Sequence, residues 1–226
     1  MKIKAIITDI EGTTTDIHFV HKVLFPYSRE NIHAYLIVNQ NKPEVITELN
    51  EIRKLMDNID ATLDDINQQL IQWIDSDVKI APLKNLQGFI WQQGFQQGEF
   101  KGHVYADAYE NLIKWHQQKI KLYIYSSGSV KAQQLLFQYS TYGDIRYLFD
   151  GYFDTKVGPK KEASSYAEIL KQIQCQPEET LFLSDVVAEC DAAYENNMQT
   201  RLLNRDNQVF EDNQHLVCHT FNEIIL

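Results

Sequence analysis

From about residue 106 onward, short apolar segments alternate with longer segments of helical character, and this alternation strongly constrains the fold. The apolar segments lie at 121–125, 149–153, 180–183 and 200–203, and the helical ones near 106–118, 129–140, 162–173 and 188–197. Parallel strands need crossover connections of a dozen or more residues, usually helices, so this order favours βαβ units. We therefore expect an α/β fold with a doubly wound parallel sheet.

The first strand of that sheet is expected far from the others in sequence. Residues 3–8 form a short apolar run that ends at Asp9, as in a buried parallel strand. Apolar residues then recur at three-to-four spacing through a long segment, which is the helical period. The sequence thus predicts a Rossmann-like α/β core of residues 1–16 and 106–226, with a helical domain, 17–105, inserted after the first strand.

The clearest helix of this insertion has Ile66, Leu70 and Trp73 at helical spacing. Thr62 precedes Asp65 by three residues, which is the spacing of a capping box. We therefore expect a helix to begin just after Thr62 and to bury its apolar face inside the insertion.

The composition excludes several classes of partner. The chain has 226 residues, with 21 Lys and Arg against 31 Asp and Glu, and a net charge of −10. This charge opposes binding to nucleic acids or anionic membranes, and no apolar stretch approaches the ~18 residues of a membrane span. The three cysteines form no CxxC pair, so we expect reduced thiols in a cytoplasmic protein. A single small phosphate ester stays compatible with the charge if a metal ion or local donors screen the repulsion.

In a parallel sheet of this type, ligands bind beyond the carboxyl ends of the strands, so the residues that follow each strand are the candidates for chemistry. The first strand is followed by Asp9 and Glu11, whose side chains point the same way in an extended chain, and by Gly12, which permits a tight turn. One carboxylate of such a pair can attack phosphorus while the other moves a proton. Taken alone, the segment also fits a solvated turn capped by the threonines that follow.

Two further strand ends carry polar side chains. The 121–125 strand is followed by Ser126, Ser127 and Gly128, and hydroxyls with backbone N–H groups at a helix start can bind phosphate. Asp185 follows the 180–183 strand and offers a carboxylate oxygen, the type of ligand that Mg²⁺ prefers. Capping of the next helix explains each of these residues equally well.

A loop before the 162–173 helix supplies positive charge. Lys160 and Lys161 follow Gly158 and Pro159 there. A lysine at this point would neutralise a phosphate and a nucleophile as they approach each other. Adjacent lysines in a loop are also common on a solvated surface, and the spacing alone leaves open which of the two enters a site.

Each of these four motifs is a weak signal by itself. Because they occur together and in this order, they resemble the motifs of the haloacid-dehalogenase-like (HAD) hydrolase superfamily. The segment 9–13 resembles its nucleophile motif, Ser126 its second motif, Lys160 its third and Asp185 its fourth. A glutamate at position 11, where the superfamily usually has aspartate, is typical of the enolase-phosphatases, also called acireductone synthases. The segments 82–91 and 98–105 are similar to that family as well, so the resemblance covers almost the whole chain.

The resemblance implies a bifunctional, Mg-dependent enzyme of methionine salvage. Members of the family convert 2,3-diketo-5-methylthiopentyl-1-phosphate, by way of an enol phosphate, into the acireductone 1,2-dihydroxy-3-keto-5-methylthiopentene and phosphate. They form an aspartyl-phosphate intermediate, use one Mg²⁺ per chain and are typically monomeric. The implied partner is therefore a small phosphorylated molecule.

The same resemblance assigns roles residue by residue. Asp9 would be the nucleophile and, with the Glu11 backbone carbonyl and Asp185, a metal ligand. Glu11 would be the acid/base and, by its proximity, the candidate for the enolisation proton. Lys160, favoured over Lys161 because it matches the family position, would hold the nucleophile and the phosphoryl group. The residues implied in substrate binding are Ser126, Ser127, Lys160, Lys84 and Gly88.

Glu189 departs from the superfamily pattern, which often has an aspartate four residues after Asp185. A glutamate reaches further, so it is expected to hydrogen-bond a metal-bound water rather than to bind the metal itself.

Two other functions fit part of the pattern. Another HAD-type small-molecule phosphatase would share the four motifs but not the sequences of the insertion. A receiver-like phosphoacceptor would be near half this length and would lack the insertion.

Overall fold

The structure, a computed structural model, describes residues 2–210 and 213–226, and in these residues six parallel strands form one sheet. The spatial order is β3-β2-β1-β4-β5-β6, and β1 is paired with β2 on one side and β4 on the other. The strands are β1 (Ala5–Thr8), β2 (Lys121–Tyr125), β3 (Gly151–Phe153), β4 (Thr180–Ser184), β5 (Gln199–Leu203) and β6 (Leu216–Cys218). The chain changes its direction across the sheet between β1 and β4, the point where folds of this type bind ligands. The predicted doubly wound sheet is confirmed.

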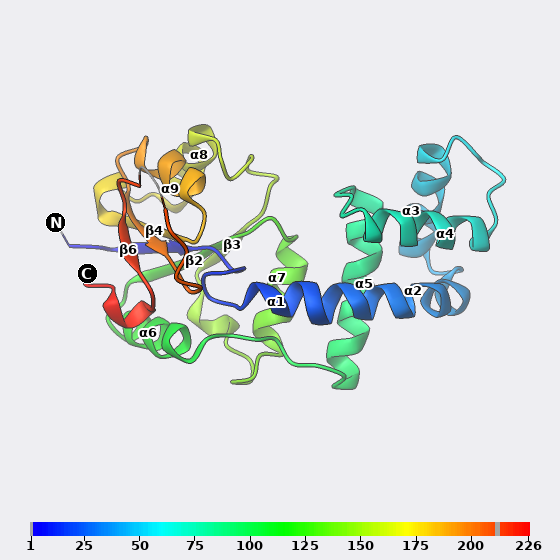
Figure 1. Ribbon diagram of the computed structural model, residues 1–226, viewed down its shortest axis with the longest axis horizontal. Helices are drawn as coiled ribbons and strands as arrows, with labels where there is room; N and C mark the ends of the chain where they lie inside the picture. Colours follow the sequence, from blue (N-terminus) through cyan, green and yellow to red (C-terminus); the bar gives the residue numbers. More distant parts are fainter. Residues whose placement is uncertain (1, 211–212) are drawn as a thin grey trace. The chain divides into compact units, whose positions relative to one another are not determined.

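Helices cover both faces of this sheet. On one face lie α6 (Ala106–Gln117) and α7 (Val130–Gln138), and on the other lie α8 (Ala163–Ile173) and α9 (Val187–Tyr194) (Figure 1). Right-handed crossovers require this arrangement, because the chain crosses the sheet in opposite directions before and after β3. Buried side chains of α8 and α9 pack with Ile7 of β1 and Phe182 of β4. This packing makes β1 and β4 the rigid centre of the sheet.

The chain forms two compact units. We call Met1–Ile17 together with Lys101–Leu226 the core unit, and His18–Phe100 the cap unit. The returning segment 101–105, which the sequence interpretation assigned to the insertion, is tied to the core unit by its backbone. Gly102 N–H donates to the Tyr139 carbonyl at 2.8 Å, and Tyr105 N–H donates to the Thr14 carbonyl at 2.9 Å.

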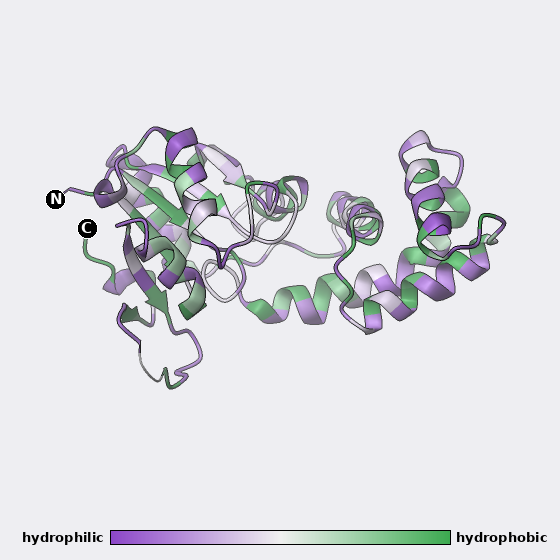
Figure 2. Ribbon diagram, turned by 90° about the horizontal axis from the view of Figure 1, so that it is seen from above, coloured by the Kyte–Doolittle hydropathy of each residue, from purple (hydrophilic) through white to green (hydrophobic). Residues whose placement is uncertain are grey.

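The cap unit is helical and has its own apolar core. Its elements are α1 (Ile17–Phe19), which begins at the end of the core unit, the π-helix η1 (Val20–Leu24), α2 (Phe25–Asn39), α3 (Pro43–Leu55), α4 (Leu63–Asp75) and α5 (Ala81–Gln97). Their buried residues include Ile32, Leu49 and Ile66. The strands of the core unit are mostly hydrophobic, whereas these helices carry hydrophobic and hydrophilic residues in alternation (Figure 2). Such amphipathic helices are stable only when they pack on one another.

The capping box predicted at the start of α4 is confirmed. The Thr62 hydroxyl accepts a hydrogen bond from Asp65 N–H at 3.2 Å, and the Asp65 carboxylate accepts one from Thr62 N–H at 2.9 Å. Across the described residues, no helix has the length and apolar character needed to cross a membrane.

Candidate active site

Asp9 lies at the carboxyl end of β1, next to β4. Its N–H donates to the Leu183 carbonyl at 2.9 Å, and the residue is only 3% exposed. The chain then forms a tight loop in which the N–H groups of residues 13–15 all donate to the Ile10 carbonyl, at 2.9 to 3.2 Å. The Thr14 hydroxyl donates to the Asp9 carbonyl at 3.2 Å. The threonines therefore shape the loop around Asp9 rather than cap a helix.

Lys160 is buried between two carboxylates. Its Nζ lies 2.6 Å from Asp9 Oδ1 and 2.7 Å from Glu189 Oε2, and its side chain is 9% exposed. The Tyr166 hydroxyl donates to the Lys160 carbonyl at 2.7 Å, which fixes the backbone at this point. Lys161 is exposed. Of the two adjacent lysines, the structure brings Lys160 to Asp9.

Glu11 and Ser126 connect the ends of β1 and β2. The Ser126 hydroxyl donates to Glu11 Oε2 at 3.1 Å, and Ser126 is fully buried. The same hydroxyl accepts a hydrogen bond from Gly128 N–H at 3.1 Å, so it also shapes the turn after β2. Ser127 is exposed at this turn, and Ser129 caps α7. Capping is thus carried out by Ser129, while Ser126 is bound to Glu11.

Asp185 follows β4 and faces the loop after β1. Gly12 has a φ of 72°, and a Cβ built on it would overlap the Asp185 carboxylate. Glycine is therefore required at position 12 both for its left-handed backbone and for the space that the carboxylate occupies. The N-cap residue of α9 is Val186, so Asp185 lies outside that helix.

Comparison with known proteins identifies the family. Residues 3–195 match the haloacid dehalogenase-like hydrolases. The chain is 48% identical over 209 residues to the enolase-phosphatase E1 of Pseudomonas savastanoi pv. phaseolicola, covering 92% of each chain. It is also 48% identical over 222 residues to the enolase-phosphatase E1 of Yersinia enterocolitica, covering 98% of this chain and 96% of the relative. The chain belongs to the enolase-phosphatase family of haloacid dehalogenase-like hydrolases.

A solved structure shares the whole architecture. The UTR4 protein of Saccharomyces cerevisiae is 33% identical, with a TM-score of 0.83, and the match covers 99% of this chain and 100% of that one. The family, the HAD-type fold and the phosphatase class of enzyme that the sequence predicts are all confirmed by these relatives.

The site carries an excess of negatively charged groups. Burial, and next the Asp9 carboxylate, raise the pKa of Asp185 to about 7. The same two causes, in the same order, raise the pKa values of Glu11 and Glu189. Burial lowers the pKa of Lys160, but Asp9 and Glu189 outweigh it, and the net shift is upward. One ammonium therefore faces four carboxyl groups, and the site favours a further cation or a retained proton.

The donor set fits a hard divalent cation. Asp9, Glu11 and Asp185 offer oxygen atoms from side chains and backbone, and oxygen is the ligand that Mg²⁺ prefers. Within the part of the chain that the structure describes, no three His, Cys, Asp or Glu side chains gather into a group that could hold a metal ion. Mg²⁺ is commonly held by only one or two carboxylates, with water and phosphate oxygens completing its shell.

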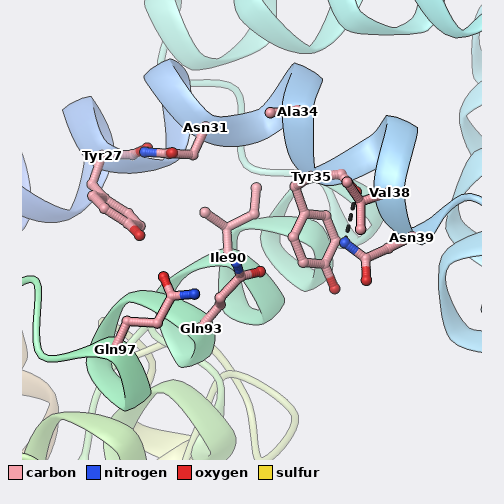
Figure 3. A pocket seen from close by; sticks show the side chains of 9 residues that line it. All are labelled: Tyr27, Asn31, Ala34, Tyr35, Val38, Asn39, Ile90, Gln93 and Gln97. Atoms are coloured by element: carbon pink, nitrogen blue, oxygen red, sulfur yellow. Dashed lines mark hydrogen bonds between the residues drawn. The ribbon is translucent and has the colours of Figure 1, made fainter.

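Lys84 and Gly88 lie in the cap unit, four residues apart on α5, and so share one face of that helix. A cavity of about 160 Å³ lies between α2 and the other side of α5 (Figure 3). It is lined by Tyr27, Asn31, Ala34, Tyr35, Val38, Asn39, Ile90, Gln93 and Gln97. The cavity therefore includes neither of the two residues implied in substrate binding.

Some contacts of the site could not be read from the motifs. Glu189, expected near a metal-bound water, has its Oε2 on Lys160 and also accepts a hydrogen bond from the Ser184 hydroxyl at 2.8 Å. Tyr125 and Tyr166 hold the carbonyls of Gly158 and Lys160 through their hydroxyls, at 2.9 and 2.7 Å. No motif in the sequence marks these two tyrosines, because only their hydroxyls take part.

Proposed function

We propose that this chain converts 2,3-diketo-5-methylthiopentyl-1-phosphate to acireductone and phosphate in methionine salvage, as a monomer in the cytoplasm. The observation that carries the proposal is the buried Asp9 carboxylate, 2.6 Å from Lys160 and two residues before Glu11. The relatives named enolase-phosphatase E1 match this chain over nearly their whole length and support the bifunctional reaction.

Asp9 acts as the nucleophile. One of its carboxylate oxygens forms a bond to phosphorus while the bond from phosphorus to the substrate oxygen breaks, which leaves an aspartyl phosphate. Lys160 stabilises the charge that gathers on the phosphoryl oxygens and keeps Asp9 oriented. Water then attacks the aspartyl phosphate, and the bond to Asp9 breaks to release inorganic phosphate.

Glu11 moves the protons of both steps. Its raised pKa favours a carboxyl group that keeps its proton and can give it to the leaving oxygen. The carboxylate that results takes a proton from the attacking water, which restores the starting state. Ser126 orients Glu11 through the hydrogen bond of 3.1 Å. Glu11 is also the acid/base nearest to the nucleophile in the loop, so it takes the enolisation proton. For this step, which comes first, Glu11 gives its own proton to solvent, takes the proton from the substrate carbon and so returns to the protonated form, while the enolate oxygen takes a proton from solvent.

One Mg²⁺ per chain would be held by the carboxylates of Asp9 and Asp185 and by the backbone carbonyl of Glu11. When bound, it supplies charge neutralisation at the phosphoryl oxygens and polarises a substrate carbonyl, which acidifies the adjacent C–H. Ser126 and Ser127 bind the phosphate, and Lys84 and Gly88 of the helical insertion bind the substrate.

The test is an assay of the purified protein with the diketo phosphate, with Mg²⁺ or with a chelator. Released phosphate and the ultraviolet absorbance of the enol are followed together. We expect both signals with Mg²⁺ and neither with the chelator, and restored activity when Mg²⁺ is returned in excess.

Absence of both signals with Mg²⁺ would contradict the proposal. Phosphate release from other small phosphomonoesters, without turnover of the diketo phosphate, would instead identify another HAD-type small-molecule phosphatase. Unchanged turnover with the chelator would remove Mg²⁺ from the proposal but leave the substrate in place.

A further inference from the structure

Arg205, in the core unit just after β5, is an almost buried arginine outside the four motifs. Its side chain is 9% exposed, and its Nη1 lies 2.8 Å from Asp107 Oδ2. The guanidinium lies 4.2 Å from the centre of the Tyr105 ring and 5.3 Å from that of the Phe221 ring. Ring stacking and a charged partner together hold a planar guanidinium in one orientation.

Nη1 also donates to the His219 carbonyl at 3.5 Å, and the other two nitrogens of this guanidinium are both directed at one further peptide oxygen. Nε and Nη2 of Arg205 donate to the Thr13 carbonyl at 3.2 and 2.9 Å. Thr13 is fully buried, and it belongs to the loop that begins at Asp9. Two charge-assisted hydrogen bonds from a rigid fork restrict the direction of that carbonyl as well as its distance.

The loop connects this carbonyl closely to the nucleophile. Thr13 N–H donates to the Ile10 carbonyl at 3.2 Å, and the Thr14 hydroxyl donates to the carbonyls of both Asp9 and Ile10. The next carbonyl of the loop, that of Thr14, accepts a hydrogen bond from Tyr105 N–H. A shift of the Thr13 peptide therefore reaches Asp9 through a short chain of hydrogen bonds.

We propose that Arg205 is a positioning residue for the nucleophile, acting through the Thr13 carbonyl to keep the 9–15 loop and Asp9 in the attacking geometry. This inference rests on the proposed function, because it takes Asp9 as the attacking group. The guanidinium of Arg205 is directed at protein groups, so loss of this side chain should lower kcat rather than raise KM. A displacement of reacting groups by about 1 Å costs on the order of 100-fold in rate.

The first test variant is Arg205→Lys, which keeps a charge for Asp107 but offers no planar fork to the Thr13 carbonyl. We expect kcat to fall at least about tenfold while KM stays within about twofold and the melting temperature stays near that of the wild type. The second is Arg205→Ala assayed with added guanidinium chloride at low millimolar concentration. We expect the added guanidinium to restore part of the lost kcat, because it can occupy the place of the side chain.

Arg201→Lys is the matched control. Arg201 lies on β5 in the same unit and its Nη1 donates to the Thr200 carbonyl at 2.8 Å, away from the loop. This variant should keep the kcat of the wild type, and guanidinium should not stimulate it.

The proposal is overturned if folded Arg205→Lys has the kcat of the wild type. It is equally overturned if the activity of Arg205→Ala is lost only in proportion to the unfolded fraction and guanidinium has no effect. The wild type is assayed first, with the diketo phosphate. If it releases no phosphate, the proposed function fails and this inference fails with it, whereas an active wild type beside an unaffected lysine variant contradicts this inference alone.

Discussion

The candidate active site of the core unit and the surface of the cap unit place charged side chains in opposite environments. In the cap unit, Arg29 pairs with Asp75 at 2.7 Å, but the two side chains are 48% and 50% exposed. In the core unit, Lys160 pairs with Asp9 at 2.6 Å, and the two side chains are 9% and 4% exposed. The distances are nearly equal, so the difference in environment decides the energetics. An exposed pair adds little to stability, whereas removing one partner of a buried pair leaves a charge without water.

This contrast separates stability from chemistry. The cap unit is held by apolar packing of residues such as Ile32, Leu49 and Ile66, and its ions stay in water. The core unit also has an apolar core, but in addition it keeps carboxyl groups so close together that their negative charges repel, which is a common property of active sites. Substitutions at the site should therefore change activity far more than those in the framework of the cap unit.

Asp9→Asn should have the largest effect. The amide has nearly the same shape but is a poor nucleophile, so we expect phosphate release to fall by at least about 1000-fold. The melting temperature should change little, because Lys160 keeps Glu189 as its partner. Phosphate release and thermal unfolding, measured on the same preparation, check this. Retained turnover would show that another group attacks phosphorus.

Lys160→Ala and Lys161→Ala should differ strongly although the residues are adjacent. Loss of the buried ammonium beside Asp9 should lower kcat by about 100-fold or more, and loss of the exposed Lys161 should change it less than about twofold. Phosphate release at saturating substrate measures both variants. The reverse order would assign the catalytic role to the neighbouring lysine.

Asp185→Asn should stabilise the metal-free protein while it removes activity. Burial, followed by Asp9, raises the pKa of Asp185 from the ordinary 3.8 to about 7. The folded protein thus holds this proton more tightly than the unfolded chain, so the group makes the fold less stable as the pH rises between these two values. Above about pH 7, Asp185→Asn should raise the free energy of unfolding by about 1–2 kcal/mol, and near pH 4 it should change it little.

Denaturant unfolding with a chelator, at about pH 8 and about pH 4, measures this difference. Asp206→Asn, at an exposed position of the core unit, serves as the control for the loss of one carboxylate charge. A destabilised Asp185→Asn variant at the higher pH would show that the carboxylate is better solvated than its burial indicates.

Thr62→Ala should have the smallest effect, confined to the cap unit. Loss of the capping hydroxyl should destabilise α4 by about 1 kcal/mol and leave kcat unchanged. Hydrogen exchange of the α4 amides measures the local change. Thr47→Ala is the control, because that hydroxyl donates to the Pro43 carbonyl within α3, whose N-cap residue is Lys42. A loss of activity in Thr62→Ala would contradict the conclusion that the framework of the cap unit affects stability rather than chemistry.

Most elements of the fold could be predicted from local pattern. The strands β1 to β5 lie within two residues of their predicted bounds, because most of them are apolar runs bounded by polar residues or turns. The edge strand β6 was missed. It has only three residues, and Leu216 and Val217 are exposed, so it carries no burial pattern that a sequence could reveal. Its position depends on pairing with β5.

The sequence by itself determined the sheet, the helical insertion and the set of strand ends that hold polar residues. It could do so because the periods of strands and helices are local, and because parallel strands bring their carboxyl ends to one edge. Only the tertiary structure decided that Lys160 rather than Lys161 meets Asp9, that Glu189 binds this lysine, and that Arg205 binds the loop that begins at Asp9. These are contacts between segments far apart in the chain, and their distances depend on how helices and loops pack around the sheet, which no spacing in the sequence encodes.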